Sequence, residues 1–153
     1  MGNYFFDSSA LVKRYIAEAG STWVGDLTHR AHGNRCYLSN IAGAEVVAAL
    51  SRRLIFGGSK RTFAPTAIAI FRSDFSQRFL IIALSASIIE SAMDLAERHS
   101  LRGYDSVQLA VALKINSRFL AGRDRCTLVS ADLELNSAAI AEGLTVENPN
   151  DHP

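Results

Sequence analysis

The chain alternates short runs of strand type with longer helical patterns from one end to the other. Short apolar runs of strand type lie at residues 3–6, 35–39, 80–84, 126–129 and 144–146. Between them, apolar residues recur at the three- and four-residue spacing of amphipathic helices. This alternation is typical of a parallel sheet, because each parallel strand reaches the next through a crossover. The sequence therefore predicts an α/β fold with a central parallel sheet of four to five strands flanked by helices.

The helical segments differ in how much of their surface is apolar. Residues 41–56 and 65–79 each carry one apolar stripe, and we expect these two helices to form an antiparallel pair. Residues 105–117 are apolar nearly all round, which predicts a buried helix. Further helices are expected from Leu11 to a stop at Gly20 and over 21–31, 85–99 and 133–142.

A chain of 153 residues is long enough to form a single domain with a sizeable core. Apolar residues make up 48% of it and charged residues 20%, which is typical of a well-packed globular protein. We assign one domain to residues 1–147. The polar end, residues 148–153, is predicted to be a flexible tail.

The charge balance and the cysteines restrict the class of protein. A formal net charge of +1 provides no global field for nucleic acid, so any attraction must come from local basic patches or a metal ion. Cys36 and Cys126 are isolated in predicted strands, which favours buried apolar roles and fits a reducing cytosol. The longest apolar stretch, residues 79–89, is too short to span a bilayer. We therefore expect a cytoplasmic protein.

Four acidic residues lie in or beside predicted junctions between a strand or cap and a helix: Asp7, Glu45, Asp105 and Asp132. Each has a structural explanation when it is taken alone. Aspartate is a favoured helix N-cap, and Asp105 with Gln108 matches a capping box. Glu45 alone would be an ordinary surface glutamate, because it points away from the apolar stripe of its helix.

Two observations favour a shared role for these acids. Hydroxyl residues that could cap the helices lie beside them, so that the aspartates are not obligatory caps: Ser8 and Ser9, Ser106, and Ser130. In addition, the right-handed crossover rule brings the ends of parallel strands to one edge of the sheet, where ligands of such sheets bind. Asp7 follows the first strand and Asp132 the fourth, so we expect both at that edge.

Carboxylates gathered in this way require a counter-ion. Two of them about 4 Å apart repel by about 4 kcal/mol at an effective dielectric of 20. An all-oxygen site without His or Cys selects a hard ion, Mg²⁺ or Mn²⁺, which can activate water against a phosphodiester. The histidines do not match a metal-binding motif in their spacing, since they fall in predicted helix ends, loops or the tail: His29, His32, His99 and His152.

Four segments resemble a known family. They read YFFDSSALVKRYIAE, SNIAGAEVVAALSRR, RGYDSVQLAVAL and TLVSADLELNSAAIAEGLTVENP. In order and spacing, over essentially the whole chain, they resemble the PIN-domain nucleases and more closely the VapC-like ribonuclease toxins of toxin-antitoxin pairs. The resemblance implies a single PIN-like domain.

The resemblance also implies an activity and the residues that carry it. Asp7, Glu45, Asp105 and Asp132 would line a site for Mg²⁺ or Mn²⁺, supported by Ser9 and Ser130. RNA would be cut by metal-activated water, and a small antitoxin would cover the groove. One departure is a longer segment between the last two acids, with the insert NSRFLAGRDR, which makes Asp124 a rival for the fourth acid.

Local cations would bind the substrate. Arg52 is the first candidate for a phosphate contact, because it lies on the face of Glu45 about two turns along the same helix. Other candidates are Lys13, Arg14, Arg53, Lys60, Arg61 and Arg102. Apolar residues on the helix pair of 41–79 could form the surface for the antitoxin or for a homodimer.

Two other functions remain open. An aspartate-nucleophile phosphatase or a phospho-aspartate receiver also has an Asp after the first strand of a parallel sheet. The phosphatase, however, needs a second Asp where this chain has Ser9. The second alternative is a binding module that keeps the PIN fold without catalysis. The presence of all four acids argues against it, but a sequence alone does not show that they converge.

Overall fold

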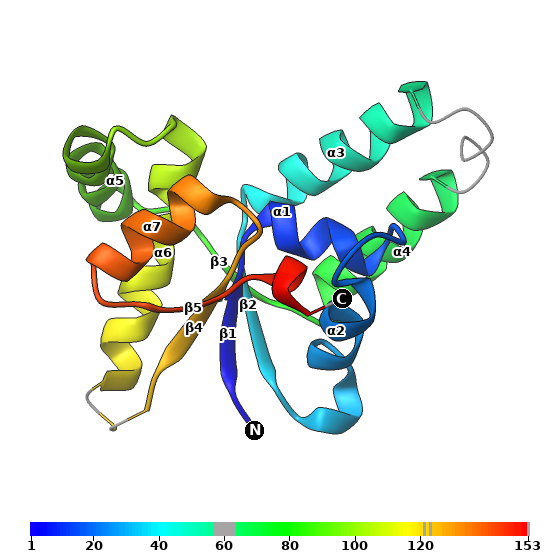
Figure 1. The fold of residues 1–153 in the computed structure, drawn as a ribbon, viewed down its shortest axis with the longest axis horizontal. Coiled ribbons are helices and arrows are strands. Elements are labelled where there is room, and N and C mark those ends of the chain that lie inside the picture. Colours follow the sequence, from blue (N-terminus) through cyan, green and yellow to red (C-terminus); the bar gives the residue numbers. More distant parts are fainter. Residues whose placement is uncertain (57–63, 121, 123, 153) are drawn as a thin grey trace.

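The computed structural model describes residues 1–56, 64–120, 122 and 124–152. Its centre is a sheet of five strands in the order β3-β2-β1-β4-β5, and every pair of neighbours is parallel (Figure 1). The strands are β1 (Asn3–Phe6), β2 (Arg35–Ser39), β3 (Leu80–Ile82), β4 (Cys126–Val129) and β5 (Thr145–Glu147). The predicted α/β fold with a parallel sheet is confirmed.

Helices cover both faces of the sheet. The α-helices are α1 (Ser8–Leu11), α2 (Ser21–Leu27), α3 (Ala42–Phe56), α4 (Ala64–Gln77), α5 (Ala86–His99), α6 (Gly103–Leu120) and α7 (Leu133–Ala141). Short 3-10 helices are η1 (Val12–Arg14), η2 (Arg30–His32) and η4 (Pro149–Asp151). No helix in the described ranges is long and apolar enough to cross a membrane.

The central strand β1 separates two apolar cores. Successive side chains of a strand point to opposite faces, and both Phe5 and Phe6 are fully buried. Phe5 packs in the core under α5, α6 and α7, whereas Phe6 packs in the core under α1, α2, α3 and α4. The sheet is thus covered on both faces, as a parallel sheet requires, and ligands can approach it only at its ends.

Helices α3 and α4 lie side by side and project from the body of the protein (Figure 1). The close approach is possible because Gly43 has no side chain: a Cβ there would lie 3.1 Å from the ring of Phe75. Gly43 is near the start of α3 and Phe75 near the end of α4, so the two helices are antiparallel, as predicted.

The first helical segment begins and ends earlier than predicted. The pattern indicated a helix from Leu11 that Gly20 stops, whereas α1 begins at Ser8 and its extension η1 ends at Arg14. The helix begins earlier because Asp7 caps it. Helix α6 likewise begins at Gly103, so Asp105 lies in its first turn and is not the N-cap of a capping box.

Residues 148–152, which fall in the predicted flexible tail, are packed against the domain in the structure. Asn148 caps η4, and Pro149 is buried. The ring of His152 stacks on Trp23 with the centroids 4.2 Å apart. The polar composition of this segment suggested a free tail, but its partners lie far away in the sequence.

The side chain of Lys13 holds this segment in place. It is only 6% exposed, and its ammonium group donates to Ala19 O at 3.0 Å and Asn150 Oδ1 at 2.8 Å, with Glu18 Oε1 at 3.2 Å. These contacts use the three donors of the ammonium group, so the buried charge is compensated. Lys13 therefore ties η1, the loop before α2 and η4 together.

Candidate active site

Asp7 lies at the carboxyl edge of the sheet, where the strands end and the helices begin. It follows β1 directly, and its backbone N–H donates to Val129 O of β4 at 3.0 Å. Its Oδ2 accepts from Ser9 N at 3.0 Å and so caps α1. Asp7 is only 4% exposed, and burial raises the pKa of its carboxyl group, with a smaller contribution from the negative charge of Asp132.

Asp132 has the same role at the start of α7. Its Oδ1 accepts from Leu135 N at 2.9 Å, which caps the helix. Asp7 and Asp132 thus each use one carboxylate oxygen as a cap. An aspartate at either position can cap a helix and still offer an oxygen to a ligand.

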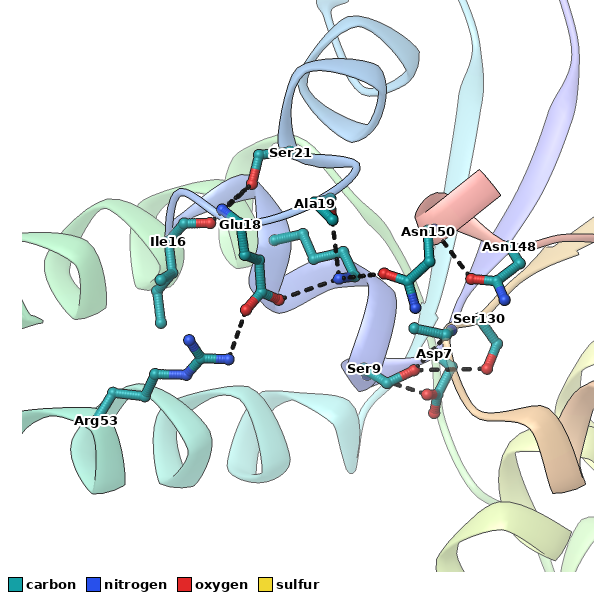
Figure 2. A network of polar contacts seen from close by, with 12 residues as sticks. Asp7, Ser9, Ile16, Glu18, Ala19, Ser21, Arg53, Ser130, Asn148 and Asn150 are labelled. Carbon is teal, nitrogen blue, oxygen red and sulfur yellow. Dashed lines mark hydrogen bonds and ion pairs between the residues drawn. The ribbon is translucent and has the colours of Figure 1, made fainter. Parts of the chain in front are cut away.

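The neighbouring serines do not cap these helices, contrary to the argument that they could replace the aspartates. Ser9 Oγ accepts from Ala131 N at 3.0 Å, and Ser130 Oγ accepts from Asp132 N at 3.0 Å. The two hydroxyl oxygens are 3.5 Å apart (Figure 2). Ser9 and Ser130 therefore join the turn after β1 to the turn after β4 and fix the positions of both aspartates.

Glu45 enters the site from α3 and is held by a chain of hydrogen bonds. Its Oε2 accepts from Gln108 Nε2 at 2.7 Å, and Gln108 Oε1 accepts from Ser39 Oγ at 2.8 Å. Burial, followed by the charge of Asp7, raises the pKa of Glu45 to about 7. The side chain is partly buried, so it is not the ordinary surface glutamate that its helix pattern suggested.

Asp105 comes from the first turn of α6. Burial raises its pKa to about 6, and the charges of Asp132 and Asp7 act in the same direction. Arg102 lowers this pKa, while Glu134 raises it. Asp105 therefore lies within electrostatic reach of the two capping aspartates as well as of a cation and a further carboxylate.

The four predicted acids thus come from four parts of the chain, and the charges of Asp7, Asp105 and Asp132 each help to raise the pKa of another acid in the set. In the part of the chain that the structure describes, no three His, Cys, Asp or Glu side chains are close enough together to form a finished metal site. The chemistry of these four acids nevertheless suits a hard divalent cation. All four side chains offer carboxylate oxygen, and three of them have pKa values raised by burial and neighbouring negative charge.

The raised pKa values predict a pH dependence of stability in the absence of divalent cations. Folding favours the protonated forms of Glu45 and Asp105. The resulting stabilisation is complete below their ordinary pKa values of 4.5 and 3.8, and is lost as the pH rises through about 7 and about 6. In EDTA, we expect the melting temperature to fall by a few degrees between about pH 5 and about pH 8.

Thermal unfolding by circular dichroism would measure this shift. The double variant Glu45→Gln, Asp105→Asn should show a flatter profile, because both titrating groups are gone. A wild-type protein that becomes more stable over the same interval would contradict the crowding of these carboxyl groups.

Asp124, the rival for the fourth acid, lies at the opposite edge of the sheet. Its Oδ2 accepts from Asn3 Nδ2 at 2.7 Å, and Asn3 pairs with Cys126 at the start of β1 and β4. A four-residue strand is about 13 Å long, so Asp124 is separated from the carboxyl edge by the length of β4. Asp124 is therefore excluded from the site.

The basic side chains predicted to contact phosphate differ in their exposure and in their contacts with the protein. Arg52 is exposed, and its one hydrogen bond in the described ranges is a 3.4 Å contact to Ala48 O of its own helix. Arg102 is also exposed and acts on Asp105. Of the other candidates, Lys13, Arg14 and Arg53 form ion pairs with Glu18 or Asp74, whereas Lys60 and Arg61 lie outside the described residues.

The sequence patterns did not indicate the positions of two further residues in this region. Gln108 was interpreted as a capping residue, but it is fully buried and joins β2 to α3 through Ser39 and Glu45. A glutamine in a helix that is otherwise apolar all round was the signal that could have indicated a buried polar role. Glu134 follows Asp132 by two residues and was not considered, because its helix position predicts an exposed charge.

Comparison with known proteins agrees with this architecture. Residues 4–140 match the model of the PIN domain family. PAE2754 from Pyrobaculum aerophilum has a similar fold, with a TM-score of 0.64 and 19% identity over 95% of this chain and 89% of that one. VapBC2 from Rickettsia felis and VapBC-1 from nontypeable Haemophilus influenzae each give a TM-score of 0.57, with 21% and 15% identity over 95% of this chain and 97% of theirs.

No curated protein matches the chain. The solved structures share its fold at low identity, and the family match extends over most of its length, from β1 into α7. The chain belongs to the PIN domain family.

Proposed function

We propose that this protein is a metal-dependent endoribonuclease that hydrolyses RNA phosphodiester bonds with Mg²⁺ or Mn²⁺. The proposal rests most on the raised pKa values of Asp7, Glu45 and Asp105, which burial and the negative charges of neighbouring acids produce at the carboxyl edge of the sheet. Such crowding of negative charge is unfavourable without a cation, whereas a bound cation makes it favourable. The PIN domain match supports a nuclease.

The acidic side chains would have different roles in the hydrolysis. A bound divalent cation supplies activation of water and neutralisation of the scissile phosphate. Asp7 and Asp132 would offer it their second oxygens, whose positions are fixed by the caps and by Ser9 and Ser130. Glu45 would accept the proton of the attacking water at Oε1, because Gln108 already donates to Oε2.

We further propose that the protein acts in the cytoplasm as the toxin of a toxin-antitoxin pair. The fold likeness to the VapBC proteins and the resemblance to VapC-like toxins support this role. An apolar groove of about 530 Å³ between α3 and α4, with Val47, Phe71 and Phe75 in its lining, would receive the antitoxin. A homodimer through the same helix pair is the other expected assembly, and light scattering with and without the antitoxin would separate the two.

Incubation of the purified protein with single-stranded RNA tests the activity. We expect cleavage with Mg²⁺ or Mn²⁺, loss of cleavage when EDTA is added, and recovery when excess Mn²⁺ follows. Cleavage that continues in EDTA would contradict the metal mechanism. A protein that binds RNA or an antitoxin but cuts nothing would instead be a catalytically silent binding module.

A small phosphoryl donor separates the proposal from a phosphatase or receiver. A nucleophilic Asp7 would become covalently labelled, whereas a water nucleophile leaves the protein unlabelled. We expect no label on the intact protein by mass spectrometry.

A further inference from the structure

A cavity of about 560 Å³ opens beside the proposed active site, between the end of α5 and the start of α7. Its lining is His99, Ser100, Leu133, Glu134, Ser137 and Ala138. Leu133 and Glu134 directly follow Asp132, so two residues of the lining are next to one of the four acids in the sequence. Its volume is within the range of small-ligand sites, about 300–1,000 Å³.

Two of the four polar side chains that line this cavity, His99 and Ser137, already have partners. His99 Nε2 lies 2.7 Å from Glu142 Oε1, and Ser137 Oγ donates to Leu133 O at 2.8 Å. Within the ranges that the structure describes, Ser100 Oγ has no hydrogen bond, and the exposed carboxylate of Glu134, the charged group without a partner in this lining, has neither a hydrogen bond nor an ion pair. The side chain of Leu133 beside it is 70% exposed, although it is apolar.

An apolar surface next to a free carboxylate suits a flat ligand that carries N–H donors on one edge. Nucleobases of single-stranded RNA have this form, and proteins recognise them by contacts to the ring face and by hydrogen bonds to the Watson–Crick edge. Among the four bases, guanine alone presents two adjacent donors on that edge, N1–H and N2–H, which match the two oxygens of a carboxylate. Adenine and cytosine present one donor beside an acceptor, and uracil presents one donor between two carbonyls.

We propose that this cavity is a guanine subsite for the nucleotide next to the scissile phosphate. Glu134 accepts hydrogen bonds from N1–H and N2–H of the base, and Leu133 packs against its face. The subsite depends on the proposed nuclease activity and adds a sequence preference to it. Arg102, exposed beside Asp105, is near enough to the acids to contact the phosphate of the same strand.

An arginine side chain of a partner protein also carries parallel N–H donors that match a carboxylate. The position of the cavity favours the base. It adjoins Asp132, so an RNA strand whose scissile phosphodiester lies at the four acids would bring the neighbouring nucleotide to Leu133. The groove of α3 and α4, which would take the antitoxin, is lined by different residues.

The test uses short synthetic RNAs that differ at one position in an otherwise uniform uridine strand. The variable base is guanine, inosine, which lacks the N2 amino group, or adenine. Initial rates of cleavage beside that base are measured with Mn²⁺ for wild type and Glu134→Gln. The matched control is Glu90→Gln, which changes an exposed glutamate on α5 outside the cavity.

We expect wild type to cut beside guanine roughly ten to a hundred times faster than beside adenine, with inosine between them, as for other bidentate base contacts. Glu134→Gln should bring the guanine-to-adenine ratio close to one, because an amide cannot accept both hydrogens. Glu90→Gln should keep the wild-type ratio. Equal melting temperatures of the variants would show that the ratio does not change through loss of folding.

Three outcomes would overturn the inference. If wild type cuts RNA with no preference for guanine, the subsite is wrong while the proposed nuclease stands. If the preference persists in Glu134→Gln, another residue reads the base. If the preference is absent and Glu134→Gln weakens only the complex with a protein partner, the cavity is a protein contact. If the protein cuts neither these RNAs nor longer ones, the proposed nuclease activity itself is wrong.

Discussion

Replacing Asp7 by asparagine is expected to abolish RNA cleavage and leave the protein folded. The amide oxygen of asparagine can still accept from Ser9 N and cap α1, so the local structure is kept. The negative charge for the cation is lost, which removes several kcal/mol of transition-state stabilisation and corresponds to a decrease of about a thousandfold in rate.

The same substitution should make the metal-free protein at least as stable as wild type. Asp7 is buried, and burial raises its pKa, so its ionised form is unfavourable in the fold. Asparagine removes this charge. A higher or equal melting temperature in EDTA, together with the lost activity, distinguishes a functional group from a structural one.

Asp124→Asn is the matched control for this experiment. It makes the same chemical change at the opposite edge of the sheet, beside Asn3, and should keep the wild-type rate. Undiminished cleavage by Asp7→Asn would rule out the metal mechanism. Loss of cleavage in both variants would point to a general effect of the substitution and not to the site.

Replacing Gly20 by alanine is expected to destabilise the fold by several kcal/mol. Gly20 has φ of +82°, where an L side chain costs about 1–2 kcal/mol. A Cβ there would also overlap the carbonyl oxygen of Pro149 and lie 2.7 Å from its carbonyl carbon. Pro149 cannot easily withdraw, because Lys13 holds the neighbouring Asn150. At about 2–4 °C per kcal/mol, the melting temperature should fall by roughly 10 °C.

Gly143→Ala separates the two contributions. Gly143 has nearly the same φ, +84°, but a Cβ there would meet no atom within 4 Å. Its substitution should therefore cost only the conformational part, about 1–2 kcal/mol. Equal losses of stability in the two variants would show that the C-terminal segment is not seated against Gly20.

The positions of the strands could be predicted closely, because each strand has a recognisable pattern in its local sequence. The strands at 3–6, 35–39 and 126–129 have the bounds predicted for them, since each is a short apolar run with turn signals on both sides. The packed C-terminal segment could not be predicted in this way. Its order depends on Lys13, Gly20 and Trp23, more than a hundred residues away.

The candidate site was predictable to the extent that topology determines it. Asp7 and Asp132 follow neighbouring parallel strands, so their shared edge follows from the fold. The position of Glu45 depends on Gln108 and Ser39, a buried contact between three elements that no local pattern reveals. The role of the serines also depends on tertiary structure, because Ser9 and Ser130 meet only when the two turns are brought together.

We propose that carboxylates distant in the sequence form a single binding site for one kind of ion. A crystal of the protein soaked in manganese chloride and measured at the manganese absorption edge tests it most directly. We predict an anomalous peak bounded by oxygens of Asp7, Asp105 and Asp132, with Glu45 beside it. A peak held by other side chains, or none while manganese supports cleavage in solution, would contradict the claim.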